Sequence, residues 1–242
     1  MIRFISKDQA YQTIQPLIKD LLKDENQEVR KGAVNAAMKF IEVLGVDSIN
    51  AFHGSFKQCL EDTKWRVRLE LLRNITELSC KLNVNFILFE NSEVFLKFLE
   101  PFYVFYINDR ANAIRKLGVA KLGELSRIYA KNWLPQFFNK LSELLNKDVS
   151  YHYKISVLYS LKEICMDHSN EQYVEKSIVL MVKAGGDKVP NVREACVKCF
   201  HDMIIRWDKG SYRESMKKQL SLFAEDSDIE VRERATEILS RL

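Results

Sequence analysis

The sequence predicts an all-α fold, an α-α superhelix in which six helical pairs stack into one solenoid. First, an aspartate recurs six times, followed five residues later by Val, Ile or Tyr and six residues later by Arg or Lys. Second, successive aspartates are 38, 47, 39, 39 and 39 residues apart, a period typical of stacked helical pairs. Third, 8 Gly and 4 Pro in 242 residues are too few for a loop-rich or disordered chain. The copies are Asp24/Val29/Arg30, Asp62/Val67/Arg68, Asp109/Ile114/Arg115, Asp148/Tyr153/Lys154, Asp187/Val192/Arg193 and Asp226/Val231/Arg232.

The second helix of each pair follows the aspartate. Apolar or small residues stand 9, 13 and 16 positions after it, as Ala33, Ala37 and Phe40 do in the first copy. Counted from the Val, Ile or Tyr position, the steps are 4, 4 and 3, which trace one face of a helix. The pattern predicts second helices over residues 27–44, 65–82, 111–129, 150–166, 190–206 and 229–241.

The first helix of each pair ends just before the aspartate. The residue three positions earlier can pack inward in every copy, and these residues are Leu21, Cys59, Tyr106, Leu145, Ala184 and Phe223. We expect first helices over residues 9–22, 47–60, 92–107, 133–146, 171–184 and 212–224. The whole chain, 1–242, is then one solenoid domain with repeats near 9–45, 46–83, 84–130, 131–168, 169–208 and 209–242.

Proline, glycine and one insertion punctuate this pattern. Pro190 suits the first turn of a second helix, and the glycine pair 185–186 suits the end of a first helix. Pro16 and Pro101 fall inside first helices, where the missing N–H predicts a kink. The spacing of 47 exceeds 39 by eight residues, so we interpret the Phe-rich segment 83–94 as an excursion between repeats.

The repeated aspartate and cation have a joint structural explanation. Each aspartate lies in the turn between two helices, and each Arg or Lys lies one turn into the second helix. Stacking therefore brings the aspartate of one repeat near the cation of its neighbour, and the sequence predicts a ladder of charge-assisted hydrogen bonds.

Composition limits the classes of function. A net charge of +4, from 37 basic and 33 acidic side chains, does not favour nucleic acid or an anionic membrane as a partner. Charged residues interrupt the most apolar stretch, 86–107, so no membrane span is expected. Five cysteines form no disulfide framework and the N-terminus carries no signal-like apolar segment, which favours the cytoplasm, with the nucleus as the alternative.

One cluster raises the question of a metal. Cys196, Cys199 and His201 lie close together, but Cys196 occupies an apolar position of the repeat and Cys199 is one turn further on. A buried cysteine commonly behaves as a small apolar core residue, so we expect no metal and no cofactor. The other histidines have no nucleophile or carboxylate at a catalytic spacing, and no known catalytic motif occurs, so the chain is not expected to be an enzyme.

The residues between the aspartate and the Val position differ most between copies. The first and last copies are polar and acidic there, whereas the middle four carry a basic and aromatic strip. In a solenoid such turns align on one edge, where stacking does not dictate their identity. Trp, Tyr and Arg are enriched in protein-interface hot spots, so Lys64, Trp65, Arg66 and Tyr151 indicate partner binding. The alternative is that Trp65 packs on the next repeat.

The segment EDTKWRVRLELL, residues 61–72, resembles the HEAT repeats of the scaffold (A) subunit of protein phosphatase 2A. The resemblance continues through residues 108–133, 148–165 and 185–198, and matches the last six of that family's fifteen repeats. It implies a non-catalytic platform that binds the serine/threonine phosphatase catalytic subunit through its turns, without the upstream repeats that hold a regulatory subunit. The partner-binding residues that we expect from the strip and the resemblance together are Lys64, Trp65, Arg66, Arg110, Tyr151, Lys154 and Val189.

Two departures from the family concern this surface. Asn112 stands where the family has a Tyr, and Lys154 stands where it has an Arg, so an aromatic anchor is lost and a bidentate fork becomes a point charge.

Two other functions stay open on sequence grounds. One is a HEAT-repeat adaptor for a different protein, as in transport or chromatin scaffolds. The other is a HEAT-like DNA glycosylase, which the modest charge disfavours.

Overall fold

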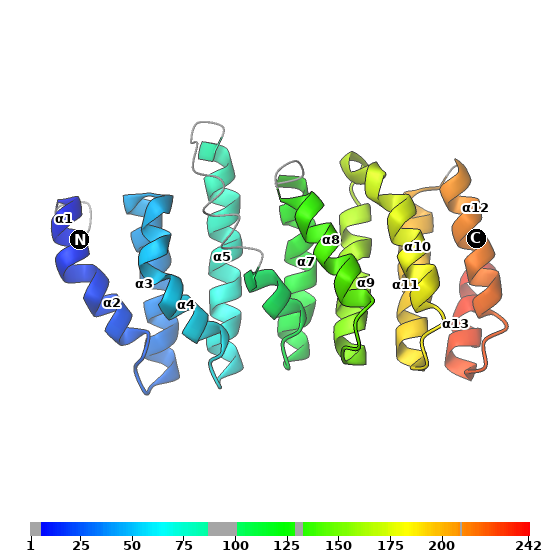
Figure 1. Cartoon of the computed structure of the whole chain (residues 1–242), viewed down its shortest axis with the longest axis horizontal. Helices are drawn as coiled ribbons and strands as arrows, with labels where there is room; N and C mark the ends of the chain where they lie inside the picture. Colours follow the sequence, from blue (N-terminus) through cyan, green and yellow to red (C-terminus); the bar gives the residue numbers. More distant parts are fainter. Residues whose placement is uncertain (1–5, 87–100, 129–132, 209) are drawn as a thin grey trace. The chain divides into compact units, whose positions relative to one another are not determined.

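The computed structural model describes residues 6–86, 101–128, 133–208 and 210–242, and every regular element in these ranges is a helix. The predicted fold class, an all-α helical-repeat array, is confirmed. The chain forms two compact units, Met1–Gly118 and Val119–Leu242. Within each unit the helices follow one another as up-and-down pairs (Figure 1).

Unit 1 contains the first repeats. Its elements are α1 (Lys7–Gln9), a π-helical turn (Ala10–Ile14), α2 (Gln15–Leu21), α3 (Gln27–Leu44), a 3-10 segment (Val46–Phe52), α4 (His53–Leu60), α5 (Trp65–Phe86), helical residues 101–107 and the beginning of α7 (Asn112–Ile128). Helix α2 packs on α3, α4 packs on α5, and the two second helices α3 and α5 pack side by side. The pairing is therefore that of stacked repeats.

Unit 2 continues the same arrangement after the remainder of α7. Its elements are α8 (Leu134–Leu145), α9 (Tyr151–Cys165), a 3-10 segment (His168–Tyr173), α10 (Val174–Ala184), α11 (Pro190–Arg206), α12 (Gly210–Phe223) and α13 (Ile229–Leu239). Each first helix packs on the second helix that follows it, and α11 packs on both α9 and α13.

The second helices begin and end close to the predicted residues. Helix α3 begins after Asn26, whose Oδ1 accepts the Glu28 N–H at 2.9 Å, and it ends at Gly45, which adopts a φ of 100°. Pro190 is the first residue of α11, as predicted, because a first-turn residue needs no N–H donor. The predicted inner positions of the second helices are buried in the first five repeats, and they include Ala37, Phe40, Leu71, Ile75, Leu122, Leu125, Val157, Leu161, Phe200 and Met203. In the last repeat Ala235 is buried, whereas Leu239 and Leu242 are half-buried.

The first helices are less regular than predicted. In the first repeat a π-helical turn precedes Pro16, and the Gln15 N–H reaches back five residues to the Ala10 carbonyl. This wider spacing rearranges the helix bonds beside a proline that has no N–H to donate. In the second and fifth repeats the first part of the predicted helix is 3-10 rather than α. The irregularity is thus concentrated where these three repeats begin.

The predicted excursion over residues 83–94 needs a partial correction. Residues 83–86 belong to α5, which extends four residues past its predicted end because the helix continues without a glycine or proline to stop it. Residues 87–94 lie outside the described ranges. The expected kink at Pro101 also stays a prediction, because the described part of that helix begins at this residue.

The aspartate and arginine of neighbouring repeats form the predicted ladder. The Arg30 guanidinium donates from Nε and Nη2 to the two carboxylate oxygens of Asp62, at 2.6 and 3.0 Å. Its Nη1 donates to the backbone carbonyl of Asp24 at 2.7 Å, in the turn of its own repeat. Arg68 with Asp109, and Arg193 with Asp226, repeat this geometry. Each arginine therefore joins its own turn to the next one.

Five of the six aspartates also hold their own turn. The Oδ1 atom of Asp62 accepts the Lys64 N–H at 2.8 Å, two residues further on, in the bond that defines an Asx turn. The same bond is made by Asp24, Asp109, Asp187 and Asp226. The carboxylate thus fixes the backbone of the turn while it accepts the neighbouring guanidinium.

Lys154 makes a weaker rung than the arginines. Its Nζ donates to Asp187 Oδ2 at 2.6 Å, a single bond in place of a fork. Asp148 is exposed, and the cation expected to pair with it, Arg115, belongs to the other unit, so that rung stays a prediction. Beside Lys154 lies an opening of about 370 Å³, which Asp148 and Asp187 also line.

Removing one side of the most buried rung should destabilise the chain strongly. The side chains of Arg68 and Asp109 are 3% and 1% exposed, so Asp109→Ala leaves a guanidinium buried without its counter-ion. We expect a loss of about 3–5 kcal/mol in the free energy of unfolding, measured by urea denaturation followed by circular dichroism. Glu28→Ala, which removes the partner of Lys31 in an exposed pair, is the control and should cost less than about 1 kcal/mol. Similar losses for the two variants would contradict this account of the ladder.

Restoring the fork at the weak rung should stabilise the chain. In Lys154→Arg, a second N–H can reach Asp187 and a third can reach the Asp148 carbonyl, and the adjoining opening leaves space for the larger group. We expect a gain of about 0.5–1.5 kcal/mol in the free energy of unfolding. The matched control, Arg193→Lys, should lose a similar amount. A loss of stability in Lys154→Arg would show that this turn cannot accept the geometry of the other rungs.

The ladder should also make stability depend on acid. The hydrogen bond from Arg193 lowers the pKa of Asp226 below its ordinary value, and the Asp228 N–H acts in the same direction. A folded-state pKa below the unfolded-state pKa contributes stability above about pH 4, which is lost as the pH falls through the folded-state pKa. We expect the urea concentration at the unfolding midpoint to decrease as the pH is lowered below about 4. The decrease should be smaller in Asp226→Asn. Identical pH profiles for the two proteins would contradict a contribution from this carboxylate.

Candidate protein-binding site

The basic and aromatic residues predicted to bind a partner lie at the turns that the ladder fixes. In unit 1 they are Lys64, Trp65 and Arg66 of the second repeat and Arg110 of the third; we call these four residues the turn patch. All four are exposed. The Asx turn at Asp62 places Lys64 just before α5, and Trp65 is the first residue of that helix. Lys64 and Trp65 thus lie between the Asx turn and helix α5, and both of these elements fix the backbone.

The indole of Trp65 is 39% exposed. The Arg66 guanidinium carbon lies 4.8 Å from the centre of the Trp65 ring, within the range of a cation–π contact. An indole that packs in the core loses nearly all of its exposure, and that of Trp133 is only 2% exposed. Trp65 instead presents a large apolar surface to solvent beside a cation.

Arg110 connects the two turns of the patch. Its Nη2 donates to the carbonyl of Thr63 at 3.1 Å, and Thr63 directly precedes Lys64. The positive charge of Arg110 therefore lies close to the turn that carries Lys64 and Arg66. The nearest ladder carboxylate, Asp62, is occupied by Arg30, and its side chain is only 8% exposed. The turn patch therefore combines three cations with one aromatic ring, and the adjacent ladder carboxylate of Asp62 is paired with Arg30.

The predicted residues of unit 2 are placed differently. Tyr151 begins α9 and is 37% exposed, and its ring centre lies 3.9 Å from that of His152, which the prediction left out. Lys154 is committed to the rung with Asp187, and the half-buried Val189 precedes α11 and donates its N–H to Asp187 Oδ1. In unit 2, Tyr151 and His152 present rings to solvent, whereas Lys154 and Val189 contribute to the stack.

The side chain of Asn112 is also accounted for. Asn112 is exposed at the beginning of α7, and its Oδ1 accepts a hydrogen bond from Arg115 Nη2 at 3.3 Å. It supplies no aromatic surface beside the turn patch. The aromatic contribution of the patch thus comes from Trp65.

Four of the five cysteines lie in the core. Cys59, Cys165, Cys196 and Cys199 are free and buried, and burial raises the pKa of Cys59 and of Cys165 to about 12. Burial likewise raises the pKa of the Cys196 and Cys199 thiols. A thiol held in its protonated form is a poor nucleophile and a poor metal ligand. Within the described ranges, no group of three or more His, Cys, Asp or Glu side chains is arranged to hold a metal ion.

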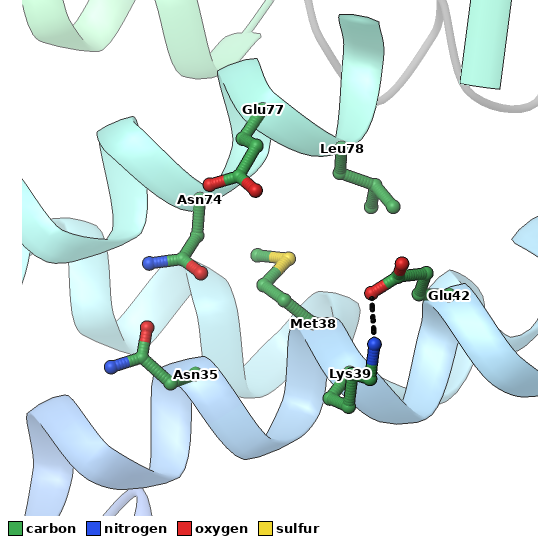
Figure 2. Close-up of a pocket in the computed structure, with 7 residues that line it drawn as sticks. All are labelled: Asn35, Met38, Lys39, Glu42, Asn74, Glu77 and Leu78. Carbon is green, nitrogen blue, oxygen red and sulfur yellow. Dashed lines mark hydrogen bonds and ion pairs between the residues drawn. The ribbon is translucent and has the colours of Figure 1, made fainter. Parts of the chain in front are cut away.

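One surface was not singled out by the sequence. Polar residues on the exposed side of α3 and α5, among them Asn35 and Asn74, line a groove between the two helices. A signal existed, since both residues lie between the buried positions 9 and 13 that follow each aspartate. Asn35 and Asn74 line the same groove only because α3 and α5 have a particular rotation about their axes (Figure 2). The periodicity of the sequence does not determine that rotation.

The described helices include none that is both long enough and apolar enough to span a bilayer.

No protein-family model matches the chain, and no curated protein sequence matches it. Among solved structures, an engineered protein studied as a Northeast Structural Genomics Consortium target is similar over 94% of this chain and 96% of its own, with 12% identity and a TM-score of 0.45. A structure titled as computationally designed armadillo repeat proteins for modular peptide recognition is similar over 93% and 98%, with 14% identity and a TM-score of 0.44. Likenesses at this level carry no conclusion about function.

Proposed function

We propose that this protein is a non-catalytic scaffold that binds another protein through the turn patch. The observation that carries the proposal is the exposure of Trp65 at a turn whose backbone is fixed by Asp62. Exposed indole is costly in water, and Trp contributes more than most residues to interface hot spots. A rigid turn also loses little conformational freedom when a partner binds.

The charge of the patch indicates the kind of surface it would meet. Lys64, Arg66 and Arg110 bring three positive charges around the indole, while Asp62 is paired with Arg30. A partner with acidic groups around an apolar pocket would complement this arrangement. Such complementarity speeds association and selects against basic partners.

The partner that we propose is the catalytic subunit of a serine/threonine phosphatase. This step rests on the resemblance of residues 61–72, 108–133, 148–165 and 185–198 to the protein phosphatase 2A scaffold, since the contact residues it implies include three of the turn patch. Buried free thiols suit a reducing compartment, and we place the complex in the cytoplasm or nucleus.

The role of Lys154 in the proposed interface is smaller than the resemblance implies. Its ammonium is bonded to Asp187, and the side chain is 20% exposed. A contact with a partner would have to share or displace that bond. We therefore assign the binding energy chiefly to Trp65 and Arg66, with Tyr151 as a separate aromatic contact.

Truncating Trp65 should weaken the complex without unfolding the chain. We expect Trp65→Ala to reduce affinity for a purified phosphatase catalytic subunit by about 2 kcal/mol or more, roughly 30-fold, in biolayer interferometry. The control is Leu222→Ala, which removes an apolar side chain that is more exposed than Trp65, at 62% against 39%, from a first helix and should bind like wild type. Thermal melting followed by circular dichroism should show that both variants are folded under the conditions of the binding experiment.

Two outcomes would count against the proposal in different ways. If wild type does not bind the catalytic subunit, the partner is misassigned, and a HEAT-repeat adaptor for another protein becomes the better hypothesis. If wild type binds and Trp65→Ala binds equally well, the partner is right but the turn patch is not the interface.

A further inference from the structure

Ser227 lies in the turn that joins α12 to α13, directly after the ladder aspartate of the last repeat. The residue is exposed, and among the described residues its Oγ atom contacts only Arg193 Nη2, at a long 3.5 Å. The fold does not use this hydroxyl, because Asp226 makes the Asx turn and Asp228 caps the helix. The hydroxyl of Ser227 is therefore open to chemical modification.

The residues on both sides of Ser227 are acidic. Glu225 and Asp226 precede it, and Asp228 and Glu230 follow it at the first and third positions. Kinases select their substrates partly by the charges around the hydroxyl, so these acids suit an enzyme with a basic substrate groove. Glu225 and Glu230 are exposed, where such a groove could meet them.

Two guanidinium groups lie beside Ser227. Arg193 of the preceding repeat holds Asp226 through Nε and Nη2, and the same Nη2 is the atom that reaches the Ser227 hydroxyl. Arg232 of the same repeat donates from Nη1 to the carbonyls of Asp226 and Ser227, at 2.7 and 2.9 Å. Within the described ranges, Nε and Nη2 of Arg232 donate to no group. A guanidinium with free donors is thus fixed beside the Ser227 backbone.

A phosphate group on Ser227 would match these donors. Phosphoserine carries a charge of about −1.5 to −2 at pH 7 and three acceptor oxygens, and arginine binds phosphate through paired N–H groups. The N-terminus of α13, which begins two residues later, also favours an anion. The adjacent carboxylates oppose it less than their number suggests, because Asp226 is paired with Arg193 and Asp228 accepts two backbone N–H groups.

We propose that Ser227 is a phosphorylation site for a kinase that recognises acidic sequences, and that the Arg232 guanidinium binds the phosphate. The γ-phosphoryl group of ATP is transferred to Ser227 Oγ. The bond from the γ-phosphorus to the bridging oxygen breaks, ADP leaves, and the hydroxyl proton passes to a base of the kinase. The proposal does not depend on the phosphatase assignment, because it uses none of the turn-patch residues.

The first test is phosphorylation of the folded full chain by casein kinase 2, an enzyme selective for acidic sequences, followed by mass spectrometry. We expect a phosphate on Ser227, and slower modification of this residue, by several-fold, in Glu230→Gln, because the acid three positions on is removed. Ser221→Ala removes an exposed serine of α12 that has no acid at the next three positions. It is the matched control, and its Ser227 should be modified as in wild type.

The second test concerns the arginine. Phosphorylation should raise the urea concentration at the unfolding midpoint of wild type. The rise should be absent in Arg232→Gln, where the phosphate meets the neighbouring acids without this guanidinium. Arg234→Gln, the same change at an exposed position of α13, is the matched control and should respond like wild type.

Three results would each overturn the proposal. They are no phosphate on Ser227 of the folded chain, no rise of the midpoint in phosphorylated wild type, and an equal rise in Arg232→Gln.

Discussion

The bond between the arginine of one repeat and the aspartate of the next is the interaction on which the rest of the structure depends. It joins side chains more than thirty residues apart, and it also ties each arginine to the carbonyl of its own turn. Because the same carboxylate accepts a backbone N–H two residues further on, neighbour contact and turn geometry are fixed by one group. Removing the carboxylate should therefore disturb both the contact between neighbouring repeats and the geometry of the turn.

This arrangement explains why the turn residues are available for recognition. Once Asp62 has fixed the turn, Lys64, Trp65 and Arg66 are not required for stacking, and they lie in solvent on a rigid backbone. The second helices divide in the same way, with a buried side that packs and an exposed side that carries the groove. The residues that stabilise the stack and those proposed to bind a partner are thus largely different, and the two sets overlap at Lys154 and Val189.

Periodicity was enough to predict the pairs, the buried positions and the ladder, because each follows from spacing along a regular helix. It predicted α3 to the residue, as Gln27–Leu44, since Asn26 and Gly45 mark both ends. It missed the π-helical turn before Pro16 and the 3-10 segments, which depend on local backbone bonding rather than on apolar spacing. It also missed the groove, because the rotation of α3 against α5 decides that Asn35 and Asn74 share one space.

The central claim is that the aspartate and arginine act on each other across repeats, and a double-mutant cycle on Arg68 and Asp109 tests it most directly. Urea unfolding of wild type, Arg68→Ala, Asp109→Ala and the double variant gives the coupling free energy of the pair. The bidentate geometry and nearly complete burial predict a favourable coupling of about 1–3 kcal/mol, so that the double variant loses less stability than the sum of the two single variants. A coupling below about 0.3 kcal/mol would mean that the two residues stabilise the chain independently, and would contradict the ladder as the organising constraint.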